Sequence, residues 1–194
     1  QSNHVGAVIG FRTSKGEQVH ARVASSFISE EQAVLNLKEL GDDSLETLKE
    51  KGRKAWNDVL GRVEVSGGDL DQYRTFYSCL YRATLFPRKF YEINSEGNPV
   101  HYSPYNGRIC DGYLYTDTGF WDTFRCLFPL VNLVYPEMAQ KMQEGWVNTY
   151  KESGFLPEWC SPGHRDCMVG NNSASVVADA YLKGIRGYDI DALW

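Results

Sequence analysis

The stretch that most clearly indicates the fold is Pro136–Gly154, PEMAQKMQEGWVNTYKESG. Proline suits the first turn of a helix, where its missing N–H would have no helical partner anyway. Glycine suits the position just after the last turn, where the backbone often turns left-handed. Large apolar side chains recur every four residues and would form one inward face: Met138, Met142, Trp146 and Tyr150. This spacing predicts a helix that packs on a core.

Further helices are predicted on the N-terminal side of this stretch. Three pairs of residues have the spacing of a capped helix start, in which a short polar side chain accepts from the backbone three residues on: Ser29 with Gln32, Asp43 with Glu46, and Asp69 with Gln72. Pro87 would stop the third of these helices. Residues 1–27 instead alternate as strands do, around a turn at Ser14–Gly16.

On the other side, helical pattern runs from about Phe120 to Leu133 with an interruption at Pro129, and again over about 173–186. A last helix is expected near Asp189, and residues 88–118 are predicted as loop or short strand. The pattern is therefore mostly α, with helix pairs joined by long aromatic loops. Helix pairs around a central axis, an α/α toroid, and an ordinary bundle would both fit it.

The composition excludes several classes of protein. The chain has 194 residues, 42% hydrophobic and 23% charged, with a net charge of -5, which is typical of a globular domain. No block of Lys or Arg suggests a nucleic acid partner, and no apolar run approaches the roughly 20 residues of a membrane span. The 5 cysteines are odd in number and indicate no disulfide framework. Cys79 and Cys126 lie in apolar helical pattern and are predicted to be in the core, while His101 stands in unremarkable surroundings.

The segment with the most chemical potential is Thr116–Arg125, TDTGFWDTFR. An indole at Trp121 could cover the apolar face of a sugar ring, and the Asp122 carboxylate could accept from two hydroxyls. Arg125 could donate to a hydroxyl or hold that carboxylate. The alternative is structural: Asp122 and Arg125 would form an ordinary i,i+3 ion pair beside a core tryptophan.

A second loaded segment is Pro157–Asn172, PEWCSPGHRDCMVGNN. Cys160, His164 and Cys167 could be three zinc ligands, although no fourth stands nearby. Glycoside hydrolysis needs two carboxyl groups, one as acid and one as base or nucleophile, and the sequence alone selects no pair. The candidates by position are Asp111, Asp117, Asp122, Glu158 and Asp166.

Four strings carry a resemblance to a known family: SSFISEEQAVLNL (25–37), GFWDTFR (119–125), GFLPEW (154–159) and SPGHRDCMVGNNSASVVADAYLKGI (161–185). In this order they closely resemble glycoside hydrolase family 92, the bacterial exo-α-mannosidases. The resemblance implies an internal fragment of such an enzyme. Residues 1–27 would be the last strands of an N-terminal β-sandwich, 28–62 a helical linker, and 63–194 the first part of an (α/α)6 catalytic barrel.

The resemblance also implies an activity and a site. The complete protein would remove terminal non-reducing α-linked mannose from glycans, through α-1,2 or related linkages, by an inverting mechanism that needs Ca²⁺. The acid, the base and most calcium ligands would lie beyond residue 194, so the isolated chain would be inactive. Asp122 would contact mannose, with further substrate-binding residues implied around it: Trp121, Arg125, Trp159, Asn171 and Asn172.

Three expectations remain open on the sequence. Many relatives have a histidine where this chain has Asn172, which weakens the transfer of a role to that residue. Export to a periplasm or cell surface would follow from the polymeric substrates of the family. A non-catalytic carbohydrate-binding domain is the alternative function, because aromatic loops would serve it equally well.

Overall fold

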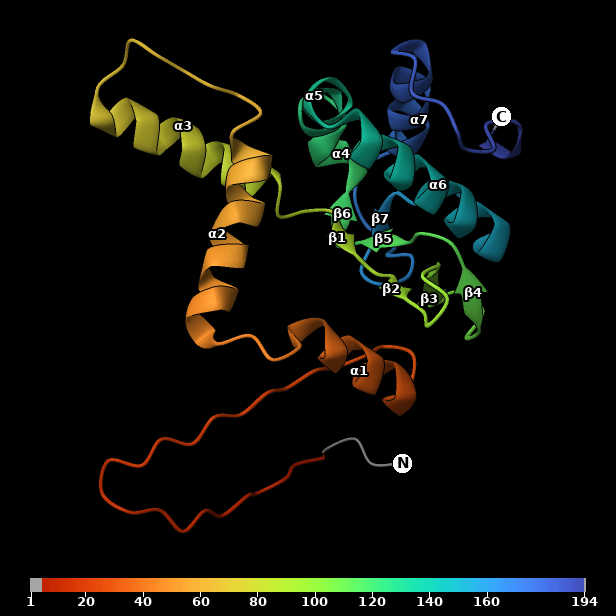
Figure 1. Ribbon diagram of the computed structural model, residues 1–194. Coiled ribbons are helices and arrows are strands. Elements are labelled where there is room, and N and C mark those ends of the chain that lie inside the picture. The colour runs from red at the N-terminus through yellow and green to blue at the C-terminus, as the bar shows by residue number, and fades with distance from the viewer. Residues whose placement is uncertain (1–4, 194) are drawn as a thin grey trace.

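A computed structural model describes residues 5–193, which fold into a helix-rich body with a long N-terminal extension (Figure 1). Seven α-helices lie in the described chain: α1 Glu30–Leu37, α2 Leu45–Leu60, α3 Leu70–Ala83, α4 Phe120–Thr123, α5 Leu127–Val134, α6 Pro136–Ser153 and α7 Asn172–Leu182. Two 3-10 turns accompany them, Lys38–Leu40 and Asp191–Leu193. None of the helices in the described part is long and apolar enough to cross a membrane.

Six short strands lie in and directly after the region 88–118 that was predicted as loop or short strand, and a seventh lies near residue 160. They are β1 Arg88–Lys89, β2 Glu92–Ile93, β3 Pro99–Tyr102, β4 Ile109–Asp111, β5 Tyr115–Thr116, β6 Thr118–Gly119 and β7 Trp159–Cys160. All pairings are antiparallel: β1 with β5, β2–β3–β4 as a meander, and β6 with β7. The strands gather on one side of α6 in Figure 1.

The core lies between α6 and the elements that surround it. Trp146 is fully buried, with Phe120 edge-on to its ring at 5.0 Å and Phe128 stacked on Phe120 at 5.6 Å. Helix α6 packs against α5, and α7 packs against α4, α5 and α6. Burying three large aromatic side chains supplies several kcal/mol of hydrophobic stabilisation, at about 1.5–3 kcal/mol each. The predicted inward face of α6 is confirmed at Met142 and Trp146, but Tyr150 is exposed.

The helix starts follow the local chemistry of their caps. Ser29 accepts from the N–H of Gln32, and Asp69 and Gln72 form a complete capping box, as predicted. The N-cap of α2 is Ser44, one residue after the predicted Asp43, because its hydroxyl accepts from the N–H of Thr47.

The helix predicted over Phe120–Leu133 is two helices. The break lies at 124–126, where Cys126 leaves helical geometry, and Pro129 lies inside the first turn of α5. A proline in the first turn needs no helical donor, so it does not interrupt that helix. Pro136 and the left-handed Gly154 bound α6 as predicted.

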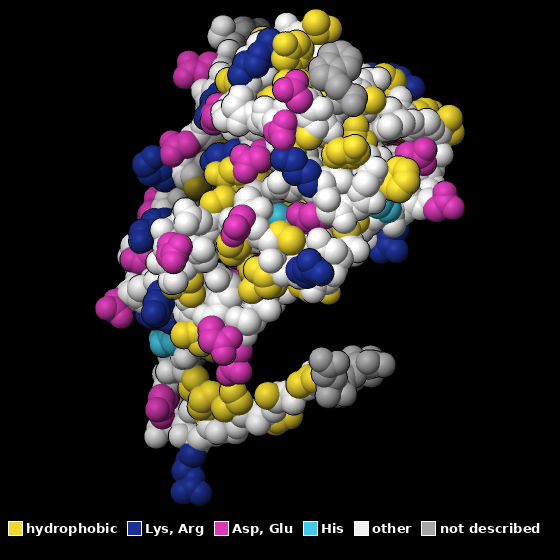
Figure 2. Space-filling view, turned by 90° about the vertical axis from the view of Figure 1, so that its right-hand side faces the viewer, with side chains coloured by type: hydrophobic (Ala, Val, Ile, Leu, Met, Phe, Trp, Pro, Cys, Tyr) yellow, Lys and Arg dark blue, Asp and Glu magenta, His cyan; other side chains and the backbone are white. Residues whose placement is uncertain are grey.

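The N-terminal extension is held by few contacts. Residues 5–27 form no strand in the described chain; they run out and back around a turn in which Glu17 N–H donates to Ser14. The sandwich strands predicted over 1–27 stay a prediction, and residues 1–4 and 194 lie outside the described residues. Helix α1 docks on β2 through Glu92, which accepts from Ser26, Phe27 and Asn36. Figure 2 shows the extension standing off from the body with hydrophobic side chains on its surface.

Candidate functional site

The candidate sugar site is built where β6, β7 and α4 meet. Gly119 pairs with Trp159 across the two strands, and Phe120 N–H donates to the Glu158 carbonyl at 3.1 Å. Helix α4 begins directly after β6, and Thr123 closes its first turn on the Gly119 carbonyl at 2.8 Å. Phe120 is buried in the core, whereas the next two side chains of the helix, Trp121 and Asp122, are exposed.

Gly119 brings Trp159 and Asp122 together. A Cβ atom added at Gly119 would lie 2.0 Å from Trp159 Cε3 and 3.1 Å from Asp122 Oδ2. The indole therefore lies directly over the glycine, with the carboxylate beside it. An aromatic face and a carboxylate at one spot are what binding of a pyranose requires, and only glycine leaves the room for them.

The structural alternative for Asp122 is not what the structure shows. Arg125 forms no ion pair with Asp122; its Nη1 donates to the Trp121 carbonyl at 2.6 Å. The guanidinium lies over the rings of Phe124 and Trp121, with centroids 4.4 and 5.2 Å away. Arg125 thus fixes the tryptophan and the end of α4.

Within residues 5–193, the Asp122 carboxylate has no hydrogen bond or ion pair to another side chain. It is an exposed acceptor beside an indole, and ionised carboxylates accept strongly from hydroxyls. Of the residues predicted from sequence, Asp122 and Trp159 come together here, and Trp121 is the neighbour of Asp122 in the chain.

Asp117 has a different task from Asp122. Its backbone is left-handed at φ 58°, a conformation that Asp tolerates better than most residues, and it separates β5 from β6. Its carboxylate pairs with Arg88 and accepts from Ser161 at 2.7 Å. Asp117 therefore ties β1 to the loop after β7 and holds the strand pair beneath Trp159 in place.

Asn171 and Asn172 open α7 and use their amides locally. Asn172 Nδ2 donates to the carbonyls of Val169 and Gly170 at 2.7 and 3.2 Å, and Ser173 donates to Asn171 Oδ1 at 2.5 Å. Asn171 also lines a cavity of about 170 Å³ between the end of α6 and the last 3-10 turn. None of Trp121, Asp122, Arg125 or Trp159 lines that cavity, and the sugar contact of the two asparagines stays a prediction.

The zinc alternative considered for Cys160, His164 and Cys167 is not supported by the structure. These residues do not form a group of nearby ligand atoms in the described chain. Cys160 is fully buried, its thiol facing the Tyr115 and Thr118 carbonyls, and burial raises its pKa to about 11. His164 instead bonds Ser153 at 2.8 Å, and partial burial lowers its pKa. Cys167 is exposed.

The predicted core positions of Cys79 and Cys126 are also wrong, because both are exposed in residues 5–193. The remaining carboxyl candidates are surface groups in this chain. Asp111 and Asp166 are exposed, and Glu158 is half-buried.

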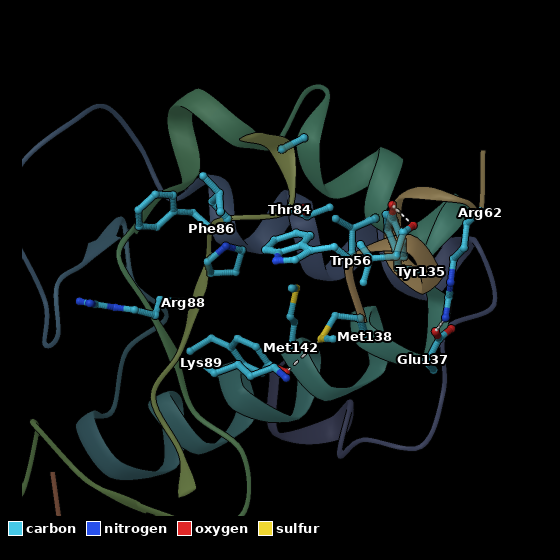
Figure 3. Close-up of a pocket in the computed structure, with 16 residues that line it drawn as sticks. Trp56, Arg62, Thr84, Phe86, Arg88, Lys89, Tyr135, Glu137, Met138 and Met142 are labelled. Carbon is cyan, nitrogen blue, oxygen red and sulfur yellow. Dashed lines mark hydrogen bonds and ion pairs between the residues drawn. The ribbon is translucent and has the colours of Figure 1, made fainter. Parts of the chain in front are cut away.

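Figure 3 shows a cavity of about 430 Å³ that lies elsewhere in the molecule. It separates α2 and the chain after α3 from α6, with Trp56, Phe86, Tyr135 and Met138 among its walls. Arg62 and Glu137 form an ion pair at one end. The walls are mostly apolar and contain no member of the Trp121–Asp122–Trp159 group, so this is a packing gap between helices.

Sequence reasoning missed one buried polar group. His101 on β3 is fully buried between the Gly112 carbonyl and Glu152, with Cys110 opposite it on β4. Alternation within a strand could have indicated that Val100 and His101 face opposite sides, but not what each would meet.

The His, Cys, Asp and Glu side chains of residues 5–193 do not gather into a group that suits calcium. The sole group of three His, Cys, Asp or Glu ligand atoms near one another in residues 5–193 is His101, Cys110 and Glu152. Calcium prefers six to eight oxygen ligands, and nitrogen and sulfur do not suit it. The calcium that the family resemblance implies therefore depends on residues outside this group.

Comparison with known proteins bears directly on this geometry. The model of the glycosyl hydrolase family 92 catalytic domain matches residues 32–194. An uncharacterized secreted glycosidase of Arthroderma benhamiae is 30% identical over 188 residues, covering 93% of this chain and 20% of that protein.

Two solved structures from Bacteroides thetaiotaomicron are similar over 87% of this chain. A family GH92 inverting mannosidase is 56% identical with a TM-score of 0.84, and this chain covers 23% of it. A family GH92 α-mannosidase in complex with mannoimidazole is 30% identical with a TM-score of 0.77, and this chain covers 22% of it. The chain thus spans less than a quarter of the length of these relatives, and since the family model matches most of it, the chain belongs to the glycosyl hydrolase family 92 catalytic domain.

Proposed function

We propose that the protein to which this chain belongs hydrolyses terminal α-linked mannose from glycans with inversion, and that this chain supplies part of the mannose-binding site. Family membership and the mannosidase relatives support the substrate class. The general acid and base belong to the remainder of the polypeptide in this proposal. Export from the cell is part of it, in keeping with the relative described as secreted.

The observation that carries the proposal is the state of Asp122. The carboxylate is exposed, unpaired within residues 5–193, and next to the Trp159 indole above Gly119. An ionised acceptor kept free of partners in the unliganded protein is ready to take hydrogen bonds from neighbouring sugar hydroxyls. No side chain has to be released first, so little binding energy is lost to rearrangement.

The two tryptophans have separate roles in this proposal. Trp159 offers its face to the C–H side of the sugar ring, because it lies beside the carboxylate. Trp121 is held from behind by Arg125, which also occupies its carbonyl. Arg125 acts as a positioning residue, and its guanidinium is not directed at Asp122.

The test is the kinetics of the full-length protein with Asp122→Ala. Loss of a charged acceptor typically removes about 1.5–3 kcal/mol per hydrogen bond. We expect kcat/KM for an α-mannoside to fall on the order of 10- to 100-fold or more. Asp122→Asn keeps the shape and loses the charge, so it should also be impaired.

Asp42→Ala is the matched control, since Asp42 is an exposed aspartate on the loop before α2. It should leave kcat/KM unchanged. A folded Asp122→Ala protein with wild-type kcat/KM would refute the proposed role.

A second prediction for the full-length protein concerns the dependence of its activity on calcium. A hard-cation chelator should abolish hydrolysis of α-mannosides, and Ca²⁺ should restore it where Zn²⁺ does not, because oxygen-rich sites favour calcium. Activity measured after chelation and dialysis, with each ion added back in turn, decides this. Full activity in a calcium-free enzyme would contradict it.

A further inference from the structure

A second site lies on elements that carry none of the sugar-binding candidates. His101 on β3 and Cys110 on β4 are directly paired across the two strands, so their side chains share one face of the meander. Glu152, in the last turn of α6, reaches the same face. Their ligand atoms, Nε2, Sγ and a carboxylate oxygen, all lie within 4.8 Å of one another.

The hydrogen bonds of His101 define its protonation pattern. Nδ1 lies 2.9 Å from the Gly112 carbonyl, and a carbonyl can only accept, so Nδ1 carries a hydrogen. Nε2 then faces Glu152 Oε1 at 2.8 Å. Two lone pairs at that distance repel each other. The contact therefore needs a positive centre between the two atoms, which is either one proton or a metal ion.

The contact between His101 and Glu152 is shielded from solvent, and several buried polar atoms lack a hydrogen-bond partner within residues 5–193. The His101 side chain is 0% exposed and that of Glu152 is 10% exposed. Glu152 Oε2 is buried without a hydrogen-bond partner within residues 5–193, as are the hydroxyls of Tyr105 and Thr149. A buried carboxylate oxygen without a partner costs free energy unless a cation or donor satisfies it.

We propose that His101 Nε2, Cys110 Sγ and the Glu152 carboxylate bind a divalent transition-metal ion, with Zn²⁺ the best fit. Nitrogen, sulfur and one carboxylate are the ligand types that zinc takes, three from protein and a fourth from solvent or a nearby hydroxyl. The hydrogen bond from Nδ1 to Gly112 is the outer contact that orients a metal-bound histidine and fixes its tautomer.

The geometry needs a small adjustment to accept the ion. A tetrahedral zinc holds nitrogen and oxygen ligands roughly 3.3–3.5 Å apart, so the 2.8 Å contact between His101 and Glu152 must open slightly. Glu152 can move because its second oxygen is not held. Cys110 is half-buried and bonded only weakly to Asn106 and Arg108, at 3.9 and 4.0 Å, so its thiol can turn inward.

The ion would fasten the β3–β4 hairpin to the end of α6. That is a structural role, separate from the sugar site on β6, β7 and α4, and its test does not depend on mannoside hydrolysis. The full-length protein is stripped with a chelator, dialysed against Zn²⁺ in calcium-containing buffer, and its zinc content is measured by mass spectrometry. The same protein is titrated with Co²⁺, whose thiolate charge-transfer band reports a cysteine ligand.

Cys110→Ser is the decisive variant, because it changes one half-buried atom and leaves the His101–Glu152 contact intact. We expect it to lose about one zinc ion per chain and the cobalt–thiolate band. Glu152→Gln should weaken zinc binding at least about tenfold. Cys167→Ser is the matched control, because it removes an exposed cysteine that is not among the three proposed ligands. It should keep wild-type zinc content.

Two results would overturn the proposal. A wild-type protein that retains no zinc at this step would show that a proton alone bridges His101 and Glu152. A Cys110→Ser protein with wild-type zinc content and an unchanged cobalt spectrum would place the metal elsewhere. If Glu152→Gln does not fold, the comparison of Cys110→Ser with Cys167→Ser still decides.

Discussion

The two ends of this chain contain similar side chains and bury them very differently. In the body, every member of the main core cluster lies between Tyr115 and Ile185, and Trp146 is 0% exposed. In the N-terminal part, Trp56 on α2 is 40% exposed, and Leu45 and Leu70 begin their helices in solvent. Both parts form helices with local end signals, which are side-chain N-caps on α2 and α3 and the bounding Pro136 and Gly154 on α6. The difference lies in what the helices pack against.

This difference shows that a helix can form in this chain from local signals at its ends, whereas its burial depends on what it packs against. Helices α2 and α3 are specified by local signals, namely the Ser44 cap and the Asp69–Gln72 capping box. Their apolar faces meet little within residues 5–193, whereas α6 is surrounded on most of its sides. The two solved relatives are more than four times as long as this chain. We therefore propose that the rest of the protein covers these apolar faces of α2 and α3.

The largest expected effect comes from the centre of the body. Trp146→Ala should cost about 3–5 kcal/mol, because it removes the side chain on which Phe120 and Phe128 pack. Trp56→Ala should have little effect on the 194-residue chain and a clearly larger one in the full-length protein. Thermal unfolding of both variants at both lengths measures this. Equal losses at the two tryptophans in the short chain would break the comparison.

A smaller loss of stability is expected for Gly119→Ala, at the candidate sugar site in the body. The new methyl group would overlap Trp159, and since Gly119 is backbone-paired with that residue, the indole must move. We expect a loss of about 1–3 kcal/mol in stability and a fall in kcat/KM of the full-length protein. Gly10→Ala serves as a control for the added methyl group, because its Cβ would meet open space. A Gly119→Ala enzyme with wild-type KM would mean that Trp159 does not touch substrate.

The smallest expected effect lies at the joint between the two parts. Arg62, just after α2, pairs with Glu137 on α6 and donates to the Val134 carbonyl at 3.1 Å. The hydrogen bond from Arg62 lowers the pKa of Glu137. A carboxyl group whose folded pKa is depressed stabilises the fold above its unfolded pKa of about 4.3, and that contribution is lost as pH falls through the folded value.

The pair is exposed, so its contribution should stay under about 1 kcal/mol. Hydrogen exchange of α2 should rise slightly in Glu137→Gln at pH 7, and the difference from wild type should vanish in acid. Glu50→Gln, on the surface of α2, is the control and should show no such pH dependence. An effect of Glu137→Gln that persists unchanged at low pH would rule out the ion pair as its cause.

What the sequence predicted correctly was local in origin. The caps at Ser29 and Asp69, the proline that starts α6 and the glycine that ends it depend on residues within one helical turn. The resemblance to family 92 is confirmed by the family match, because long strings of sequence carry it. The mannose contact of Asp122, which the resemblance implied, stays a prediction.

What the sequence missed depends on distant partners. Nothing near His101 indicates that Glu152 will meet it, and nothing near Arg125 indicates that it will prefer the Trp121 carbonyl to Asp122. The zinc alternative at Cys160 and His164 fails for the same reason, because the Cys160 thiol faces the Tyr115 and Thr118 carbonyls and the His164 ring bonds Ser153. The sequence also did not indicate that the chain around Asp117 is divided into two strands, β5 and β6. That division depends on the left-handed backbone of Asp117.

The pairing of β6 with β7 has a consequence for how the protein matures. Cys160 and Thr118, which meet in that pair, are separated by 42 residues, and α5 and α6 lie between them. The chain must therefore close a long loop before Trp159 can reach Gly119. A bound mannoside would favour the closed arrangement by mass action. Newly synthesised protein should gain affinity for sugar only late in folding, which makes ligand binding a reporter of completed assembly.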